Sequence, residues 1–331
     1  MQDKSEVIIG SRPIFLGGYP KSGTTLLCAL LDFHPDLLVF PTETKYLSSF
    51  SLRKKSEFES DFNQLVNSYQ EIFGKASLHS SGFRDYRHIS SCAFHDSVRK
   101  KFDASDKTVP RGLEAMMLGY HEASGRTAFP VDRWVEKTPR NEKYFKTAKS
   151  WWPEAKLIVM VRDPRDALLS HRRYQVKKKS KKCIALGDFV RAWLDSYNLV
   201  NDEIETNSSR ALIVKFEDLV GDREKTMQMV SDFLNLQMDP VLYVPTKAGR
   251  SWEGNSSLGD SRVTDVKNDV LLKVRLGKLE TLFINIVLGF AIKKLGYNYD
   301  YWLFRLPQGL SKASGKLGYG IQLVGNFLSN K

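Results

Sequence analysis

Apolar residues along the chain gather in short continuous runs that alternate with longer stretches of mixed polarity. Residues 13–18, 156–161 and 211–216 are runs of this kind, and residues 134–137 have the composition of a strand end. Runs of this length without polar alternation are typical of strands buried on both faces. The stretches between them predict helices at residues 24–33, 58–73, 113–123, 141–150, 165–174, 187–205 and 222–234. Strands that alternate with helices indicate an α/β fold with a parallel sheet.

The composition is that of an ordinary folded protein with a basic charge. Hydrophobic residues make up 42% and charged residues 27% of the 331 residues, so disorder is not expected as the main state. The formal net charge of +12 favours anionic partners such as nucleotides and sulfated or phosphorylated molecules. The sequence has no zinc-finger spacing, RNP-type motif or basic-region heptad, so we expect no nucleic-acid partner.

Cysteine spacing and hydropathy indicate in which cellular compartment we expect the protein. Cys28, Cys92 and Cys183 lie far apart without the spacing of a metal knuckle or a redox motif, which fits a reducing compartment. The first residues contain no apolar core of a signal peptide. The longest apolar run, residues 281–292, is interrupted by Asn285 and falls short of the roughly 20 residues that cross a bilayer. We therefore expect a buried helix there, no transmembrane segment and a cytoplasmic location.

A glycine-rich loop follows the first predicted strand. Residues 18–25 read Gly-Tyr-Pro-Lys-Ser-Gly-Thr-Thr, which is the G-x-x-x-x-G spacing of a phosphate-binding loop between a strand and a helix. Such a loop turns several backbone N–H groups inward, and the helix N-terminus adds a positive potential. The loop therefore predicts an anion site.

The loop differs from that of an ordinary NTPase. An NTPase has a lysine directly after the second glycine, whereas here Thr24 stands at that position and Lys21 lies inside the loop. After the strand LIVMV comes Arg162 and only then Asp163, so an aspartate placed to hold magnesium at the strand end is not evident. We therefore expect a phosphate site that works without a metal ion.

Two motifs in this order resemble the sulfotransferases that use 3′-phosphoadenosine-5′-phosphosulfate (PAPS). YPKSGTT is similar to the family's 5′-phosphosulfate loop, and VRDPRDALLS is similar to its 3′-phosphate segment. KFEDL at residues 215–219 and WEGNSS at residues 252–257 also resemble family segments. The likeness runs from about Ile14 to Tyr299. It implies an enzyme that transfers a sulfuryl group from PAPS to an acceptor, in particular to a hydroxyl.

The resemblance assigns roles in the phosphosulfate loop. It implies that Ser22, Gly23, Thr24 and Thr25 hold the 5′-phosphate through backbone N–H groups and hydroxyls. It also implies that Lys21 contacts the sulfuryl group and the bridging oxygen, in place of the loop arginine of the protein-tyrosine branch. Lysine keeps the charge of that arginine but loses its bidentate geometry.

The resemblance places the 3′-phosphate on other residues. Arg162 and Ser170 are expected to bind it, and the planar fork of arginine is well suited to phosphate oxygens. Ser256 and Ser257 belong to the WEGNSS segment, which is expected to close over the adenosine.

The acceptor must lose a proton, and two branches of the family use different bases. The cytosolic branch uses a histidine in a Lys-Thr-His-type segment, but Pro139 follows Lys137-Thr138 here. The protein-tyrosine branch uses a glutamate in a Glu-Thr-Arg-like segment after a His-Pro pair, and the chain resembles this glutamate-base branch, that is, protein-tyrosine and bacterial sulfotransferases. This chain has His-Pro at residues 34–35 and then Glu43-Thr44-Lys45. Glu43 is therefore the expected base, and Lys137 resembles the catalytic lysine of that branch.

The resemblance implies a P-loop NTPase-like three-layer α/β fold, with a central parallel sheet flanked by helices. We divide the chain into an N-terminal extension at 1–12, a sulfotransferase domain at 13–300 and a C-terminal tail at 301–331. A helical insertion at 55–130 is expected to shape the acceptor site. The first strand and the strand at 156–161 should be neighbours, so that both phosphate sites face one nucleotide at the carboxyl ends of the strands.

Two other functions are compatible with the sequence. A nucleotide-dependent kinase of P-loop fold is one, although Thr24 in the lysine position argues against it. A non-catalytic module that binds PAPS or a glycan is the other, although Lys21, Glu43 and Lys137 argue for chemistry. A glutamate-type site is compatible with a peptide tyrosine, a carbohydrate, a lipid or a small molecule as the hydroxyl-bearing acceptor.

Overall fold

The computed structural model describes residues 12–52, 55–79, 82–126, 133–180, 182–252, 254 and 274–298. The chain folds as two compact units. One unit consists of Met1–Arg162 with Ser196–Asp269, and the other consists of Asp163–Asp195 with Val270–Lys331. The first unit contains the sheet and the glycine-rich loop.

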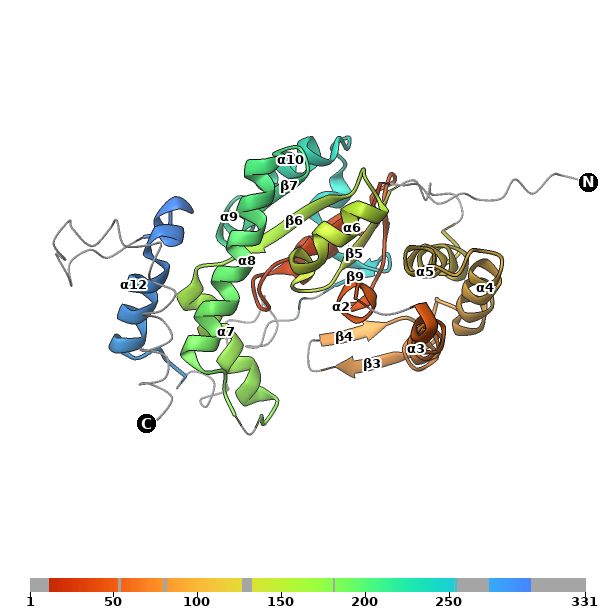
Figure 1. The fold of residues 1–331 in the computed structure, drawn as a ribbon, viewed down its shortest axis with the longest axis horizontal. Helices are drawn as coiled ribbons and strands as arrows, with labels where there is room; N and C mark the ends of the chain where they lie inside the picture. Colours follow the sequence, from red (N-terminus) through yellow and green to blue (C-terminus); the bar gives the residue numbers. More distant parts are fainter. Residues whose placement is uncertain are drawn as a thin grey trace, which may run out of the picture. The chain divides into compact units, whose positions relative to one another are not determined.

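A five-stranded parallel sheet forms the middle of the first unit (Figure 1). The strand order is β2-β5-β1-β6-β7. The strands are β1 (Ile14–Gly17), β2 (Leu38–Val39), β5 (Trp134–Lys137), β6 (Lys156–Val161) and β7 (Ala211–Lys215). β1 pairs with both β5 and β6. The predicted α/β fold with a central parallel sheet is confirmed, and so is the predicted pairing of the first strand with the strand at 156–161.

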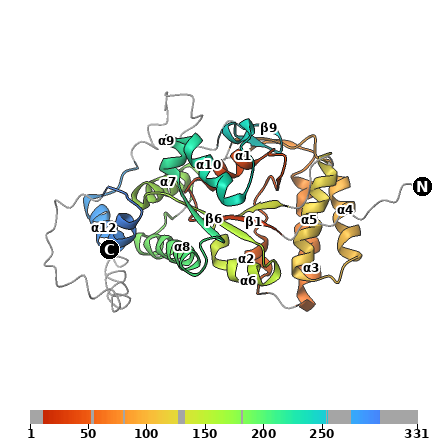
Figure 2. The same ribbon diagram turned by 90° about the horizontal axis from the view of Figure 1, so that it is seen from above.

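Helices cover both faces of this sheet, and successive side chains along β1 point alternately to one face and the other. Ile14 and Leu16 pack into one apolar cluster with α1 (Thr24–Leu31) and α10 (Arg223–Leu234). Phe15 points to the opposite face, where its ring centroid lies 5.7 Å from that of Trp134 and 6.4 Å from that of Phe145. Phe145 begins α6 (Phe145–Trp151), and Figure 2 shows α6 on the side of the sheet opposite α1 and α10.

The segment between β2 and β5 is mostly helical. It contains α2 (Tyr46–Phe50), α3 (Lys55–Ser68), η1 (Tyr69–Glu71), α4 (Ser91–Asp103), α5 (Val109–Ala123) and a hairpin of β3 (Ala76–His79) and β4 (Gly82–Asp85). Phe40, which directly follows β2, contacts the rings of Tyr69, Phe73, Phe94 and Tyr120. These aromatic contacts attach the helices to the β2 edge of the sheet.

After β7, the first unit continues with α9 (Phe216–Gly221), α10, η3 (Pro240–Tyr243) and a hairpin of β8 (Thr246–Lys247) and β9 (Arg250–Ser251). The second unit contains α7 (Pro164–Lys177), the start of α8 (Leu186–Thr206) and α12 (Lys278–Lys294). Arg172 on α7 donates to Glu280 on α12 at 2.7 Å.

The expectation of a buried helix over residues 281–292 is only half right. The helix forms as α12, but Ile286 is 50% exposed and Phe290 is 78% exposed. Ile284, Leu288, Ala291 and Ile292 are buried, so the helix hides one face rather than its whole circumference. None of the described helices combines the length and the apolarity that crossing a membrane requires.

Candidate active site

The glycine-rich loop bends sharply between β1 and α1. Gly18, Lys21 and Gly23 have φ angles of 121°, 76° and 93°. A Cβ atom at Gly18 would lie 2.2 Å from the carbonyl oxygen of Met160, and one at Gly23 would lie 2.5 Å from the ring of Phe216. Both glycines are therefore required for close packing as well as for their backbone angles. Left-handed residues among right-handed ones give the loop a form in which successive N–H groups can converge on an anion.

A buried carboxylate supports the start of this loop. Glu142 accepts a hydrogen bond from the backbone N–H of Gly18 at 2.7 Å and another from the hydroxyl of Ser196 at 2.5 Å. Burial raises the pKa of Glu142. Asn141, the preceding residue, donates its side-chain amide to the carbonyl of Leu16 on β1 at 3.1 Å. The role of Glu142 could not be predicted from the sequence, because its partner Gly18 is 124 residues away.

Three of the motifs found in the sequence meet at the loop. Arg162, which follows β6, donates to the carbonyl of Lys21 at 3.4 Å. Its guanidinium carbon lies 4.3 Å from the ring centroid of Phe216 in the KFEDL segment. Phe216 is also the ring that a side chain at Gly23 would strike. Lys21, Gly23 and Arg162 are therefore neighbours, as the expected two-phosphate site requires.

The hydroxyl of Ser22 is a buried, unsatisfied polar group in the described part of the chain. Ser22 is fully buried, and its Oγ atom has no hydrogen-bond partner among the described residues. A buried hydroxyl without a partner costs free energy unless a ligand satisfies it. The loop therefore fits a phosphate-bearing ligand.

The remaining residues of the predicted nucleotide site are Ser170, Ser256 and Ser257. Ser170 is on α7 in the second unit. Asp163 caps that helix, accepting from the backbone N–H of Arg165 at 2.9 Å and pairing with the Arg165 guanidinium at 2.5 Å. Ser256 and Ser257 lie outside the described residues. A 3′-phosphate site shared by Arg162 and Ser170 stays a prediction.

Glu43 and Lys137, which the sequence proposes as base and catalytic lysine, form an ion pair. The Nζ atom of Lys137 lies 2.6 Å from Oε1 of Glu43 and 3.4 Å from the hydroxyl of Thr25. The Lys137 side chain is 6% exposed and that of Glu43 is 39% exposed. Lys137 ends β5 and Thr25 lies in the first turn of α1, so the pair sits beside the glycine-rich loop.

The charges around Glu43 keep it ionised. Burial alone would raise its pKa, but the charge and hydrogen bond of Lys137, together with the charges of Lys45 and Arg84, outweigh burial and lower the pKa. A carboxylate in this state can accept a hydrogen bond from a hydroxyl and later its proton, although it is a weak base.

A second buried carboxylate holds the Glu43 loop in place. Glu136 on β5 accepts from the hydroxyl and the backbone N–H of Thr44 at 2.7 and 3.3 Å. It also accepts from the Thr138 hydroxyl and the Asn141 amide, each at 2.6 Å. Thr138 accepts from the backbone N–H of Lys45 at 3.0 Å. Glu136 therefore positions Glu43 without facing the cavity itself, and burial raises the pKa of Glu136.

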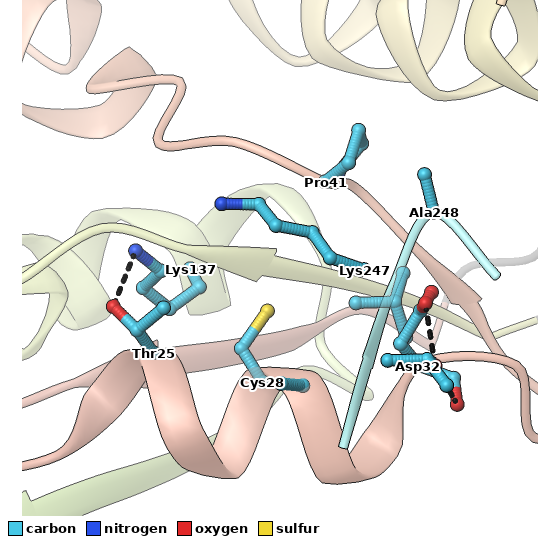
Figure 3. Close-up of a pocket in the computed structure, with 10 residues that line it drawn as sticks. Thr25, Cys28, Asp32, Pro41, Lys137, Lys247 and Ala248 are labelled. Carbon is cyan, nitrogen blue, oxygen red and sulfur yellow. Dashed lines mark hydrogen bonds between the residues drawn. The ribbon is translucent and has the colours of Figure 1, made fainter. Parts of the chain in front are cut away.

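A small cavity opens beside these residues. It is lined by Thr25, Cys28, Ala29, Asp32, Val39, Pro41, Lys137, Thr246, Lys247 and Ala248. Figure 3 shows Lys137 and Lys247 reaching over α1, with the Cys28 sulfur between them. Burial raises the pKa of Cys28 to about 12, so the thiol is neutral. Lys247 was not expected from the sequence, where it lies in a short segment without a recognisable motif.

Comparison with known proteins shows to which family the chain is similar. Residues 13–240 match the sequence profile described as the sulfotransferase family. The chain belongs to this family. The resemblance found in the sequence is thereby confirmed for the greater part of the chain.

Relatives of the chain include named protein-tyrosine sulfotransferases. Protein-tyrosine sulfotransferase A of Caenorhabditis elegans is 26% identical over 273 residues, covering 78% of this chain and 60% of the relative. Protein-tyrosine sulfotransferase 1 of Danio rerio is 24% identical over 239 residues, covering 72% of this chain and 57% of the relative. The chain therefore spans less than two thirds of the length of these relatives.

Solved structures of sulfotransferases are also similar. The sulfotransferase domain of the Synechococcus PCC 7002 olefin synthase shares 19% identity with a TM-score of 0.47, covering 87% of this chain and 98% of that domain. A mouse sulfotransferase in complex with PAP shares 13% identity with a TM-score of 0.43, covering 86% of this chain and 85% of that one.

Proposed function

We propose that this sulfotransferase-family chain transfers a sulfuryl group from PAPS to a hydroxyl of an acceptor. The observation that supports this most is the Lys137–Glu43 ion pair, which lies within hydrogen-bond reach of Thr25 at the mouth of the phosphate loop. When bound, PAPS would supply a sulfuryl group attached to a good phosphate leaving group.

The residues of the loop are the proposed donor site. The backbone and hydroxyls of residues 22–25 hold the 5′-phosphate, and the orphan hydroxyl of Ser22 gains a partner there. Arg162 binds the 3′-phosphate with its planar fork, while the ring of Phe216 fixes the position of the guanidinium. Ser170, Ser256 and Ser257 complete this donor site in the proposal.

Lysines and a glutamate carry the proposed chemistry. Lys21 and Lys137 place positive charge where the leaving phosphate oxygen gains negative charge during in-line displacement. Glu43 faces the acceptor hydroxyl and takes its proton as the oxygen becomes more acidic in the transition state. The proposal assigns no step to a metal ion.

The first experiment separates this function from the two alternatives. Isothermal calorimetry should detect binding of adenosine 3′,5′-bisphosphate (PAP), and PAP release from PAPS should continue in excess EDTA. A kinase would need magnesium and ATP, whereas a binding module would bind PAP without turnover. Absence of PAP binding would refute the proposal.

The acceptor requires its own experiment. Transfer of radiolabel from PAPS into a panel of a tyrosine peptide, carbohydrates, lipid alcohols and small phenols would identify the acceptor class. The tyrosine peptide comes first because the relatives named above are protein-tyrosine sulfotransferases. A Glu43→Ala variant should bind PAP normally and transfer at a much lower rate; transfer at the wild-type rate would remove Glu43 as the base.

A further inference from the structure

The positive charge of the chain is concentrated in the second unit. Asp163–Asp195 and Val270–Lys331 together contain 18 lysines and arginines but only six aspartates and glutamates, a net charge of +12. The first unit contains 32 residues of each sign, so its net charge is zero. A compact unit with charge of one sign attracts anionic partners. The charge of the chain thus belongs to this unit and not to the unit with the glycine-rich loop.

A lysine-rich segment begins at the last residue of α7 in this unit. Residues 177–182 read Lys-Lys-Lys-Ser-Lys-Lys. Lys177, Lys178, Lys179 and Lys182 are exposed, and no carboxylate among the described residues forms an ion pair with them. Basic clusters of this size next to a membrane-associated helix attract anionic lipid headgroups. The segment takes no part in the proposed reaction, so its charge is available for another partner.

The helix α12 of the same unit presents apolar side chains to solvent. Leu279 is 80% exposed, Ile286 is 50% exposed and Phe290 is 78% exposed. Together with half-buried Phe283, they follow one side of the helix at i, i+4, i+7 and i+11 spacing. These four residues form the α12 face. The other large apolar side chains that are exposed in the described part of the chain lie singly on different elements, which is ordinary for a protein surface.

Lysines stand at both ends of the α12 face. Lys278 precedes it, Lys293 and Lys294 follow it, and all three are exposed. No charged residue interrupts the helix from Thr281 to Ile292. Apolar side chains in the middle and lysines at the ends are typical of helices that lie in the interface of a bilayer. There the apolar groups enter the acyl boundary, while the ammonium groups stay among the headgroups.

The opposite side of α12 holds the helix within its unit, beside α7 (Figure 2). Glu280 accepts from Arg172 on α7 at 2.7 Å and from the backbone N–H of Gly277 at 2.9 Å. Arg172 thus balances the acidic residue of α12. The buried apolar side chains of the helix are Ile284, Leu288, Ala291 and Ile292. Because this side stays in contact with protein, α12 can lie along a bilayer but cannot cross it.

We propose that the second unit binds the surface of an anionic phospholipid bilayer through the α12 face. The apolar side chains of the face enter the boundary between headgroups and acyl chains, while the lysines at its ends and in segment 177–182 meet the phosphates. A second copy of the chain is a poorer partner, because two units of like charge repel each other. A nucleic acid would neutralise the lysines but would leave the apolar face in water. Neither the glycine-rich loop nor Glu43 belongs to this surface, so lipid binding and sulfuryl transfer can be tested separately.

Flotation of the full chain with lipid vesicles measures this binding. Vesicles of phosphatidylcholine with about 30% phosphatidylglycerol should bind the chain at least about tenfold more tightly than vesicles of phosphatidylcholine alone. Raising the salt concentration from about 50 to about 500 mM should weaken the binding, because salt screens the attraction between lysines and phosphates. Equal binding to the two kinds of vesicle, or binding to neither, would overturn the proposal.

A pair of double variants tests the apolar contact. Ile286→Gln with Phe290→Gln should weaken binding to the anionic vesicles about tenfold, since both side chains leave the acyl boundary. Circular dichroism and the Tm should stay close to those of the wild type, because both positions are exposed. The matched control is Leu52→Gln with Val244→Gln, which removes exposed apolar side chains from the first unit and should leave binding unchanged. Equal binding by the two double variants would overturn the assignment to the α12 face.

A second pair tests the charge. Lys278→Gln with Lys293→Gln should weaken binding to the anionic vesicles about tenfold, since each lysine near the surface contributes to the attraction. Lys100→Gln with Lys146→Gln removes the same charge from exposed positions of the first unit and should have little effect. Equal losses in the two pairs would show that the net charge of the chain acts and not the ends of α12, and would overturn the proposal.

Other occupants of the face give different results. A wild-type dimer that Ile286→Gln with Phe290→Gln converts to a monomer in sedimentation velocity would show that a second copy covers the face, and would overturn the proposal. Tighter binding to duplex DNA than to anionic vesicles, unaffected by the same double variant, would also overturn it. Lipid binding by a chain that binds no PAP would support this inference and refute the proposed function.

Discussion

The Nζ atom of Lys137 lies 2.6 Å from a carboxylate oxygen of Glu43, although 94 residues separate the two in the sequence. The parallel pairing of β2 with β5 brings them together, because Lys137 ends β5 and Glu43 lies in the loop that follows β2. The carboxyl ends of neighbouring parallel strands thus form the site, the position where such sheets commonly bind ligands.

Replacing Lys137 should remove the cation from this pair. We expect Lys137→Met to lower kcat by about 100-fold, since a lost electrostatic contact to developing charge has an effect of that size. The pKa of Glu43 should rise, because Lys137 lowers it in the wild type. Single-turnover transfer from PAPS measures the rate. Lys146→Met, at an exposed position on α6, should be neutral, and equal rates for both variants would contradict the assignment.

Gly23→Ala should damage the phosphate loop. The residue has a φ of 93°, and a Cβ atom there would lie 2.5 Å from the Phe216 ring. We expect a loss of about 1–3 kcal/mol in the free energy of unfolding, measured in urea, together with weaker PAP binding. Gly187→Ala is the control, because that site in α8 has open space and alanine favours a helix. A Gly23→Ala protein as stable as Gly187→Ala would contradict the loop geometry.

Arg162→Lys should weaken binding of the 3′-phosphate selectively. Lysine keeps the charge but loses the bidentate contact and the flat packing on Phe216. We expect PAP affinity to fall about tenfold and affinity for adenosine 5′-phosphate, which has no 3′-phosphate, to change little. Calorimetry with both nucleotides measures the difference. Arg210→Lys, at a residue paired with Glu154, should change neither affinity. Equal losses for the two nucleotides would place Arg162 elsewhere than at the 3′-phosphate.

Glu43 should make stability depend on pH in the acidic range. Its folded-state pKa lies below the ordinary 4.5, so its contribution is present above pH 4.5 and is lost as pH falls through the folded value. The Tm of Glu43→Gln should therefore be below that of the wild type at pH 7, and the gap should narrow toward pH 3. Differential scanning calorimetry checks this trend. The control is Glu224→Gln at an exposed position, whose Tm at pH 7 should be close to that of the wild type. A Tm difference between the wild type and Glu43→Gln that grows toward acid pH would contradict this prediction.

Strands β1 and β6 were predictable because they are buried along nearly their whole length, whereas β7, at the edge of the sheet, is half-buried and was found from its apolar run. The runs at residues 156–161 and 211–216 are almost wholly apolar. The first forms β6, and the second forms β7 apart from Phe216, which begins α9. β2 has only two residues, too few to produce a pattern. The β3–β4 hairpin and α4 lie in polar sequence, where packing of Phe94 and Phe73 decides the structure.

The residues of the candidate site also fall into those that the sequence predicted and those that it did not. Lys21, Glu43, Lys137 and Arg162 were found because they lie in motifs that resemble a family. Glu136, Glu142 and Lys247 were missed because their roles arise from long-range contacts that no local pattern encodes. Glu142 reaches Gly18 across 124 residues, and Asp32 reaches Gly249 across 217. The cytoplasmic location and the division at residues 13–300 stay predictions.

Asp32 accepts hydrogen bonds from the Thr246 hydroxyl and the Gly249 backbone N–H, and this tether to the β8–β9 hairpin has a consequence for protein engineering. Asp32 closes the same helix whose first turn carries Thr25, so a displacement of that helix would move the Thr25 end and the hairpin end of the cavity together. Exchanging residues 247–248 while retaining Thr246, Gly249 and Asp32 would therefore change one wall of the cavity and leave the glycine-rich loop unaltered. Libraries built on this short exchange would test whether this wall selects the acceptor of the proposed reaction.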